Sequence, residues 1–88
     1  MSPTAISAVV PRRRTTMAGR VVRVTAFSRP WVRLDVEFGD GTGTAVLRFV
    51  GRHEIPGMVP GRSLEVEGTP AMEHGTLIIL NPLYEFVA

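Results

Sequence analysis

A strict alternation of apolar and polar residues between Trp31 and Val50 predicts a β-hairpin. Each half has the period of two that is typical of a strand with one buried face. Between the halves, residues 39–43 read Gly-Asp-Gly-Thr-Gly, and such glycines and aspartates favour a tight turn. The positions expected on the buried face are Val32, Leu34, Val36, Phe38, Ala45, Leu47 and Phe49, and those expected on the outer face include Trp31, Arg33, Asp35, Glu37, Val46, Arg48 and Val50.

The segment 15–28 is rich in β-branched residues and predicts a long strand interrupted by Gly19. A glycine inside a strand commonly marks a bulge or a sharp bend. Beyond Gly19 we assign alternate residues of the strand to the core and the residues between them to the outer face. Because a bulge can reverse this parity, Phe27 faces outward only if the parity below holds and otherwise belongs to the core, which is the assignment we favour for it. The inward set is Val22, Val24 and Ala26, and the outward set is Val21, Arg23, Thr25 and Phe27.

The second half of the chain predicts two more strands. Residues 51–60 hold two prolines and two glycines and form a connection, with Ile55, Met58 and Val59 plugging one end of the core. Residues 61–68 alternate again, with Leu64 and Val66 inward and Ser63, Glu65 and Glu67 outward. Residues 69–75 are expected to be a loop, 76–80 a buried strand, and 83–86 an apolar tail.

These elements predict a single all-β domain. A chain of 88 residues builds one modest core. Five strands without an amphipathic helix fit a small Greek-key barrel, whose closure hides strand edges, and an SH3-like barrel is the alternative. We expect a flexible basic N-terminal arm over residues 1–13 and the barrel domain over residues 14–88.

Charge is unevenly distributed although the net charge is only +2. Residues 1–34 contain seven arginines and no acidic residue, giving +7, whereas residues 35–88 contain three arginines and eight acidic residues, giving −5; the two sum to +2. This split predicts one basic surface suited to a polyanion and one acidic surface turned away from it. A G+C-rich coding sequence would favour arginine over lysine, but it would not cluster the arginines.

Candidate chemistry other than binding is sparse. The chain has no cysteine, which excludes disulfides and cysteine nucleophiles and fits a cytoplasmic setting. His53 and His74 each lie beside a glutamate but at no recognised metal spacing, and residues 39–43 lack the lysine and helix of a P-loop. The apolar run 5–10 is far too short to span a membrane. We expect no enzyme, no metal or other cofactor, and no membrane association.

Four motifs stand in order along the chain: Ala18-Gly19-Arg20-Val21, then Asp40-Gly41-Thr42-Gly43, then Leu47-Arg48-Phe49, and then Pro60-Gly61-Arg62 with Val66-Glu67-Gly68. This order resembles the nucleic-acid-binding OB-fold superfamily. The closing residues 80–85 are similar to the end of the wedge domain of the branch-migrating helicase RecG, with Asn81 and Leu83 where that domain has His and Glu. The resemblance covers residues 14–86 and implies non-catalytic binding of single-stranded or junction nucleic acid.

By this resemblance the ligand crosses the outer faces of strands two and three, between the first and last loops. Aromatic rings stack on bases and arginines neutralise phosphates there. Trp31 could instead close the barrel end, and Asp35 would pair with Arg48 if Phe38 lies opposite Ala45, whereas Arg33 has no obvious partner. The candidate binding residues are Arg12, Arg13, Arg14, Arg23, Arg29, Trp31, Arg33, Arg48 and His74, with Met72 beside them.

The leading hypothesis is a stand-alone domain that binds single-stranded or branched nucleic acid, most simply DNA, with little sequence preference. Its partners would be that nucleic acid and a helicase or repair protein. The competing hypothesis is a protein-interaction or oligomerisation module, such as a homodimer built on the hairpin face. One exposed aromatic residue is a sparse platform for bases, and this motivates the alternative.

Overall fold

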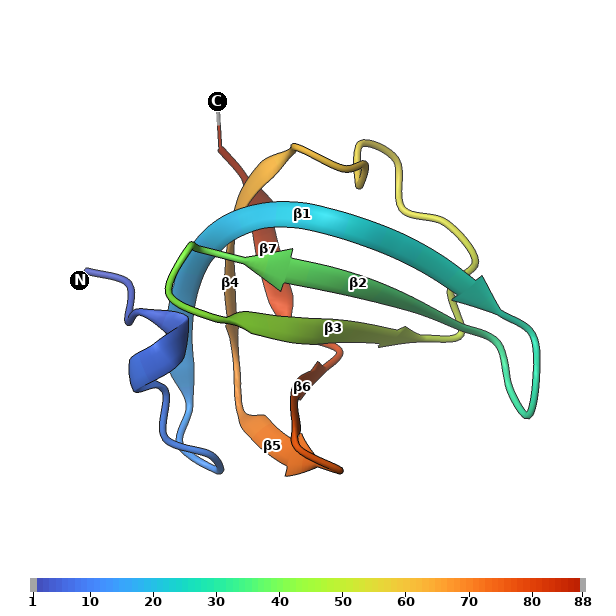
Figure 1. Ribbon diagram of the computed structural model, residues 1–88. Coiled ribbons are helices and arrows are strands. Elements are labelled where there is room, and N and C mark those ends of the chain that lie inside the picture. The colour runs from blue at the N-terminus through green and yellow to red at the C-terminus, as the bar shows by residue number, and fades with distance from the viewer. Residues whose placement is uncertain (1, 88) are drawn as a thin grey trace.

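A computed structural model gives the architecture of the protein and describes residues 2–87. The chain is all-β apart from one short 3-10 helix, as predicted. Seven strands form a sheet in the order β5-β6-β3-β2-β1-β4-β7 (Figure 1). The elements are η1(Ile6–Ala8), β1(Thr15–Phe27), β2(Arg33–Gly39), β3(Thr44–Val50), β4(Ser63–Gly68), β5(Pro70–Glu73), β6(Thr76–Leu80) and β7(Leu83–Phe86).

Two bent segments close this sheet into a barrel. The first half of β1 pairs antiparallel with β4, and its second half pairs antiparallel with β2. β6 pairs parallel with β3 and β7 pairs antiparallel with β4, and only Asn81 and Pro82 separate β6 from β7. β6 and β7 therefore serve as one bent strand that joins β3 to β4. The ring runs β1-β2-β3-(β6/β7)-β4, which is a barrel of five strands with β5 attached to the edge of β6.

The predicted hairpin is confirmed in register and in burial. Phe38 lies opposite Ala45 and Asp35 lies opposite Arg48. The inward residues of both strands, from Leu34 to Phe49, are 4% exposed or less. They form the core with Met17, Val21, Leu64, Val66 and Ile79.

The bulge in β1 lies at Val22, so the predicted parity is wrong at Val21 and Val22 and is confirmed from Arg23 to Phe27. The register shifts between Val21 and Arg23, three residues beyond Gly19 at its midpoint. Val21 is buried at 3% exposure, whereas Val22 is 48% exposed, so both predictions for these two residues were wrong. Beyond the bulge Val24 packs against the core, and Phe27 lies on the outer face rather than in the core.

Two strands occur where the sequence predicted a loop and a tail. β5 and β6 form a hairpin whose two-residue turn is His74-Gly75, with φ of 50° and 80°. Positive φ at both positions is the requirement of a type I′ turn, which joins paired strands. β7 pairs with β4, and Tyr84 and Phe86 pack against the core while Leu83 is 63% exposed.

The connection after β3 plugs one end of the barrel, as predicted, but with two residues rather than three. Ile55 and Met58 are each 4% exposed. Val59 is 54% exposed and lies outside the core. A depression of about 460 Å³ remains between this connection and the inner side of β1 and β2.

Part of the predicted flexible arm is packed on the barrel in this structure. Ile6 is 5% exposed, and its N–H donates to the Asp40 carboxylate at 2.9 Å. The Thr4 N–H donates to the Thr16 carbonyl at 2.7 Å, and the Ser7 N–H to the Thr42 hydroxyl at 3.2 Å. These contacts tie residues 4–7 to β1 and to the β2–β3 turn, because Ile6 is the apolar residue that covers this side of the core. Met1 and Ala88 lie outside the described residues, and mobility of the arm stays a prediction.

Asp40 organises both the turn and the N-terminal segment. Its carboxylate accepts hydrogen bonds from the Thr42 hydroxyl at 2.6 Å, the Ile6 N–H at 2.9 Å and the Thr42 N–H at 2.9 Å. These bonds, that of the Thr42 hydroxyl first, lower the pKa of Asp40 to about 2. Hydrogen bonds to the charged form stabilise it.

Folding stability should therefore depend on the ionisation of Asp40. In an unfolded chain the pKa of an aspartate is about 3.9, which is higher than the pKa of Asp40 in the folded protein. Its contribution is complete above about pH 5 and is lost as the pH falls toward 2. In urea unfolding, Asp40→Asn should cost about 1 kcal/mol near neutral pH and almost nothing near pH 2. A cost that is independent of pH would contradict this assignment.

Candidate nucleic-acid interface

The outer face of β1, β2 and β3 presents three parallel rows of side chains. Register places Phe27, Arg33 and Val50 in the first row, at the end near the β1–β2 loop. The second row contains Thr25, Asp35 and Arg48, and continues to Leu80 of β6. The third contains Arg23, Glu37 and Val46. Between these rows lies a shallow depression of about 180 Å³.

Arg33 is held between two aromatic rings. Its guanidinium carbon lies 4.2 Å from the centre of the Phe27 ring and 4.8 Å from that of Trp31. Its Nε lies 3.5 Å from the Asp35 carboxylate, and its side chain is only 16% exposed. The prediction that Arg33 lacks a partner was wrong, because the outward register of Phe27 supplies a ring beneath it. Arg33 supports the aromatic residues at this corner.

Arg48 is engaged by acidic residues, as the register predicted. Its Nε and Nη2 donate to the two oxygens of Asp35 at 3.0 and 3.1 Å. A second acid, Glu73 of β5, lies 3.6 Å away. These carboxylates, first of all the hydrogen bond from Asp35, raise the pKa of Arg48 above its usual value. Arg48 is therefore a paired cation, with its Nε and one N–H of Nη2 bonded to Asp35.

The exposed groups of this face that could contact a base or a phosphate include the indole of Trp31 and two arginines. Trp31 is 43% exposed and does not form a lid on the core. Arg29 is exposed in the β1–β2 loop, and Arg23 is exposed in the third row. Neither arginine makes an ion pair within residues 2–87. The corner at the β1–β2 loop thus combines a supported aromatic surface with one free cation, Arg29, and Arg23 adds a second one farther along β1.

The remaining predicted residues lie elsewhere. Arg12, Arg13 and Arg14 are exposed just before β1, at the opposite end of that strand from Trp31 (Figure 1). Arg14 pairs with Glu67 at 2.8 Å, and the Arg12 N–H donates to the Pro70 carbonyl at 2.7 Å. His74 occupies the turn of the β5–β6 hairpin, and Met72 of β5 is 54% exposed.

Charges on the outer face nearly cancel. Arg23, Arg33 and Arg48 are accompanied by Asp35, Glu37 and Glu73. Sequence reasoning assigned Asp35 to this face but missed Glu73, because it treated β5 as a loop. The alternation beyond the bulge places Phe27 on this face, whereas the preferred assignment of Phe27 to the core was wrong.

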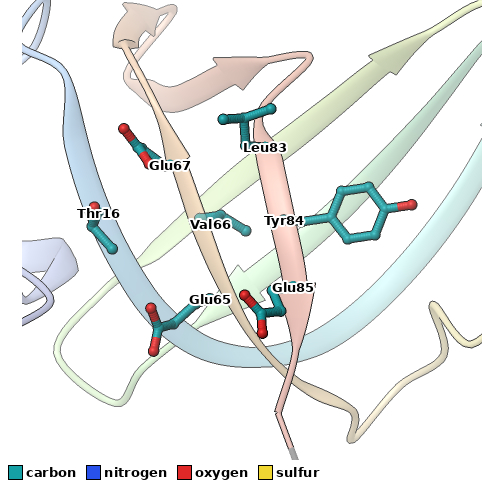
Figure 2. A pocket seen from close by; sticks show the side chains of 7 residues that line it. All are labelled: Thr16, Glu65, Val66, Glu67, Leu83, Tyr84 and Glu85. Carbon is teal, nitrogen blue, oxygen red and sulfur yellow. The ribbon is translucent and has the colours of Figure 1, made fainter.

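An acidic surface lies on a different part of the barrel wall. Glu65 of β4 is directly opposite Glu85 of β7, and Glu67 is opposite Leu83. These residues border a depression of about 220 Å³, shown in Figure 2. β4 pairs with neither β2 nor β3, so the acidic surface is separate from the outer face described above.

Within residues 2–87, His, Asp and Glu side chains form no group of three or more that could hold a metal ion. Among these residues no helix is long and apolar enough to cross a membrane.

Comparison with known proteins identifies the fold. No family model matches the sequence, and no curated protein matches it either. Among solved structures, a chain of a replication protein A heterotrimer bound to single-stranded DNA is similar, with a TM-score of 0.69 and 16% identity. The match covers 85% of this chain and 57% of that one, so this chain spans little more than half its length. The barrel is an OB-fold, as the order of the motifs predicted; the similarity to the RecG wedge domain stays a prediction.

Proposed function

We propose that this domain binds single-stranded nucleic acid at the corner formed by Trp31, Phe27 and the β1–β2 loop. The observation that supports this proposal most directly is the exposed Trp31 ring, which the Arg33 guanidinium supports from one side at 4.8 Å. A supported ring loses little conformational freedom when a base stacks on it, and each such stack is worth about 1 to 3 kcal/mol. The similar chain belongs to an assembly bound to single-stranded DNA, which supports the same ligand class here.

The free arginines extend this corner along β1. Arg29 and Arg23 are available for phosphates, whereas Arg33 and Arg48 are already paired. The nucleic-acid chain would follow β1 from the loop toward the third row. Binding that depends on two or three cations and one ring is weak and has little sequence preference.

The wider setting is also a proposal. Binding needs no catalytic group, so the domain acts as a non-enzymatic module. Junction nucleic acid is a natural variant of the ligand, because a branch point offers unpaired bases, and DNA is the simplest choice. A helicase or repair protein would supply any unwinding, and a cytoplasmic setting follows the cysteine-free composition.

Titration with a short oligonucleotide tests the proposal, since Trp31 is the only tryptophan. Its emission should be quenched when bases stack on the ring. With about three phosphates neutralised, the logarithm of affinity should fall with the logarithm of salt concentration with a slope of about −2. A duplex of the same sequence serves as a control and should bind more weakly. Absence of quenching and binding at low salt would refute the proposal.

The acidic residues of the outer face should oppose binding and stabilise the fold. Asp35→Asn removes the charge that holds Arg33 and Arg48, so it should cost about 1 to 3 kcal/mol of folding free energy. The same change should strengthen oligonucleotide binding a fewfold at low salt, because two arginines are released. Urea unfolding and the titration above measure the two effects.

Glu37→Gln provides a matched control for this charge change. Glu37 lies on the same face but makes no ion pair within residues 2–87. It should strengthen binding slightly with almost no loss of stability. Weaker binding of Asp35→Asn, measured on protein that remains folded, would contradict the assignment.

A second candidate function, that of a protein-interaction module, rests on a separate observation. Val50 is 42% exposed and Leu80 58% exposed, and both lie beside the paired Arg48 on the outer face. Apolar groups next to neutralised charges are suited to a protein interface. Protection of Val50 and Leu80 from solvent in the protein alone, together with unchanged spectra on adding oligonucleotide, would favour this interaction module over the proposed function.

A further inference from the structure

The second half of β1 has an open edge. β1 pairs with β4 only as far as Arg20, and Val21 then exchanges hydrogen bonds with Gly61 and Arg62 at 2.8 and 2.9 Å. Beyond the bulge no strand formed by residues 2–87 pairs with that side, while β2 continues on the other (Figure 1). An unpaired strand edge is a template for another strand.

The main-chain groups at this edge belong to Val24 and Ala26. The Gly51 N–H donates to the Val32 carbonyl, so the main chain of Val32 points to β3. Along a strand, the N–H and C=O groups of successive residues point to opposite sides. The N–H and C=O groups of Arg33 and Asp35 therefore point to β1. Their partners Phe27 and Thr25 point back to β2. The N–H and C=O groups of Val24 and Ala26 consequently face outward, and within residues 2–87 they have no main-chain partner beyond that edge.

We propose that this edge pairs with the same edge of a second copy of the chain. An antiparallel pairing with its two-fold axis at Thr25 sets Val24 opposite Ala26 of the second copy, and Ala26 opposite its Val24. Each outward N–H then meets an outward C=O, which gives four hydrogen bonds. The two Thr25 residues face each other in a pair without hydrogen bonds, where side chains come closest.

The side chains at this junction are compatible with one another. On the inner side, Val24 and Ala26 border the depression of about 460 Å³, so the apolar side chains of these two residues would meet those of the second copy across the junction. On the outer side, Arg23 lies opposite Phe27 of the second copy, a cation facing an aromatic ring. Thr25 is uncharged, so no like charges are directly opposed across the axis.

The other free strand edges, those of β7 and β5, are less suited to pairing with a second copy. At β7 a two-fold pairing would bring Glu85 of each copy together, beside the Glu65 that already faces it. Like charges placed opposite each other destabilise a strand pair. β5 begins with Pro70 and has only four residues. The β1 edge is therefore the one suited to a second copy, and this inference does not depend on nucleic-acid binding.

A single introduced cysteine tests the pairing, because the chain has none of its own. Facing Cα atoms in a pair without hydrogen bonds are about 4.5 Å apart, which is within the range of a disulfide. Under mild oxidation Thr25→Cys should form a covalent dimer about tenfold faster, or more, than Thr76→Cys, an exposed position at the start of β6. Non-reducing electrophoresis measures both rates without nucleic acid.

Changes at Ala26 in the Thr25→Cys background provide the control for geometry. Ala26→Pro removes an N–H that faces outward, a change that edge strands tolerate, and it should abolish the rate advantage. Ala26→Lys places like charges across the junction and should do the same, even if the proline variant fails to fold. Equal oxidation rates at positions 25 and 76, or a rate that neither change at Ala26 reduces, would overturn the proposal.

Discussion

Replacing Gly19 with alanine is expected to destabilise the domain by about 3 kcal/mol. A Cβ at this position would lie 2.4 Å from the carbonyl oxygen of Gly39 and 3.0 Å from the Phe38 ring. The first of these groups is main chain, which cannot rotate away. For a domain of this size the loss corresponds to a fall in Tm of about 10 to 25 °C. Thermal unfolding followed by circular dichroism measures it.

Gly39→Ala is the matched control, because the carbonyl oxygen of Gly39 is the atom that a Cβ at position 19 would meet first. A Cβ there would meet its nearest neighbour at 3.4 Å, which is an ordinary contact. Its effect on Tm should be small. Equal effects of the two substitutions would show that β1 and β2 do not approach each other as closely at Gly19 as the barrel requires.

Replacing Trp31 with alanine should weaken oligonucleotide binding by about fivefold to 150-fold while leaving the fold intact. The expected loss equals one stacked base, about 1 to 3 kcal/mol. Stability should change little, because the side chain is 43% exposed and lies outside the core. Fluorescence anisotropy of a labelled oligonucleotide measures the affinity of this variant, which has no tryptophan emission.

Two further variants define the role of the Trp31 ring. Trp31→Phe retains a flat surface over Arg33 and should recover part of the affinity. Leu83→Ala removes an exposed apolar residue on β7, far around the barrel, and should have no effect on binding. Equal binding by wild type and Trp31→Ala would contradict the stacking role.

The predictions succeeded where one pattern decided the structure alone. Strict alternation fixed the β2–β3 hairpin and its register, because a slip of one residue would expose every core side chain. The same pattern placed Leu64 and Val66 of β4 in the core. The order of turns and motifs indicated an OB-fold, and the similarity to a solved structure at a TM-score of 0.69 supports it.

The predictions failed where tertiary contacts decided the outcome. The sides taken by Val21 and Val22 depend on a bulge at Val22, whereas the local signal for a bend, a glycine, lies three residues earlier at Gly19. β5 and β7 are short strands that exist because β6 and β4 offer them partners. Arg33 was taken as free because its partners come from β1 and the loop, in a register that the sequence left open.

The proposed binding site contains fewer arginines than the sequence suggested, again because tertiary contacts decide which residues lie together. Residues near one another in the chain can face different sides of a barrel, so the cluster of arginines before Asp35 does not form one continuous patch. Arg12, Arg13 and Arg14 lie at one end of β1 and Arg29 and Trp31 at the other. The binding surface now rests on Trp31, Phe27, Arg29 and Arg23, with Arg33 as support.

The most direct test of binding at this corner is a nuclear magnetic resonance titration of the isotopically labelled protein with a short single-stranded oligonucleotide at low salt. Amide and side-chain signals of Arg23, Phe27, Arg29, Trp31 and Arg33 should shift together, with the indole N–H of Trp31 among the largest changes. Signals of Glu65, Glu67 and Glu85 on the acidic surface should stay in place. Shifts confined to other parts of the barrel, or no shifts at all, would contradict the proposed function.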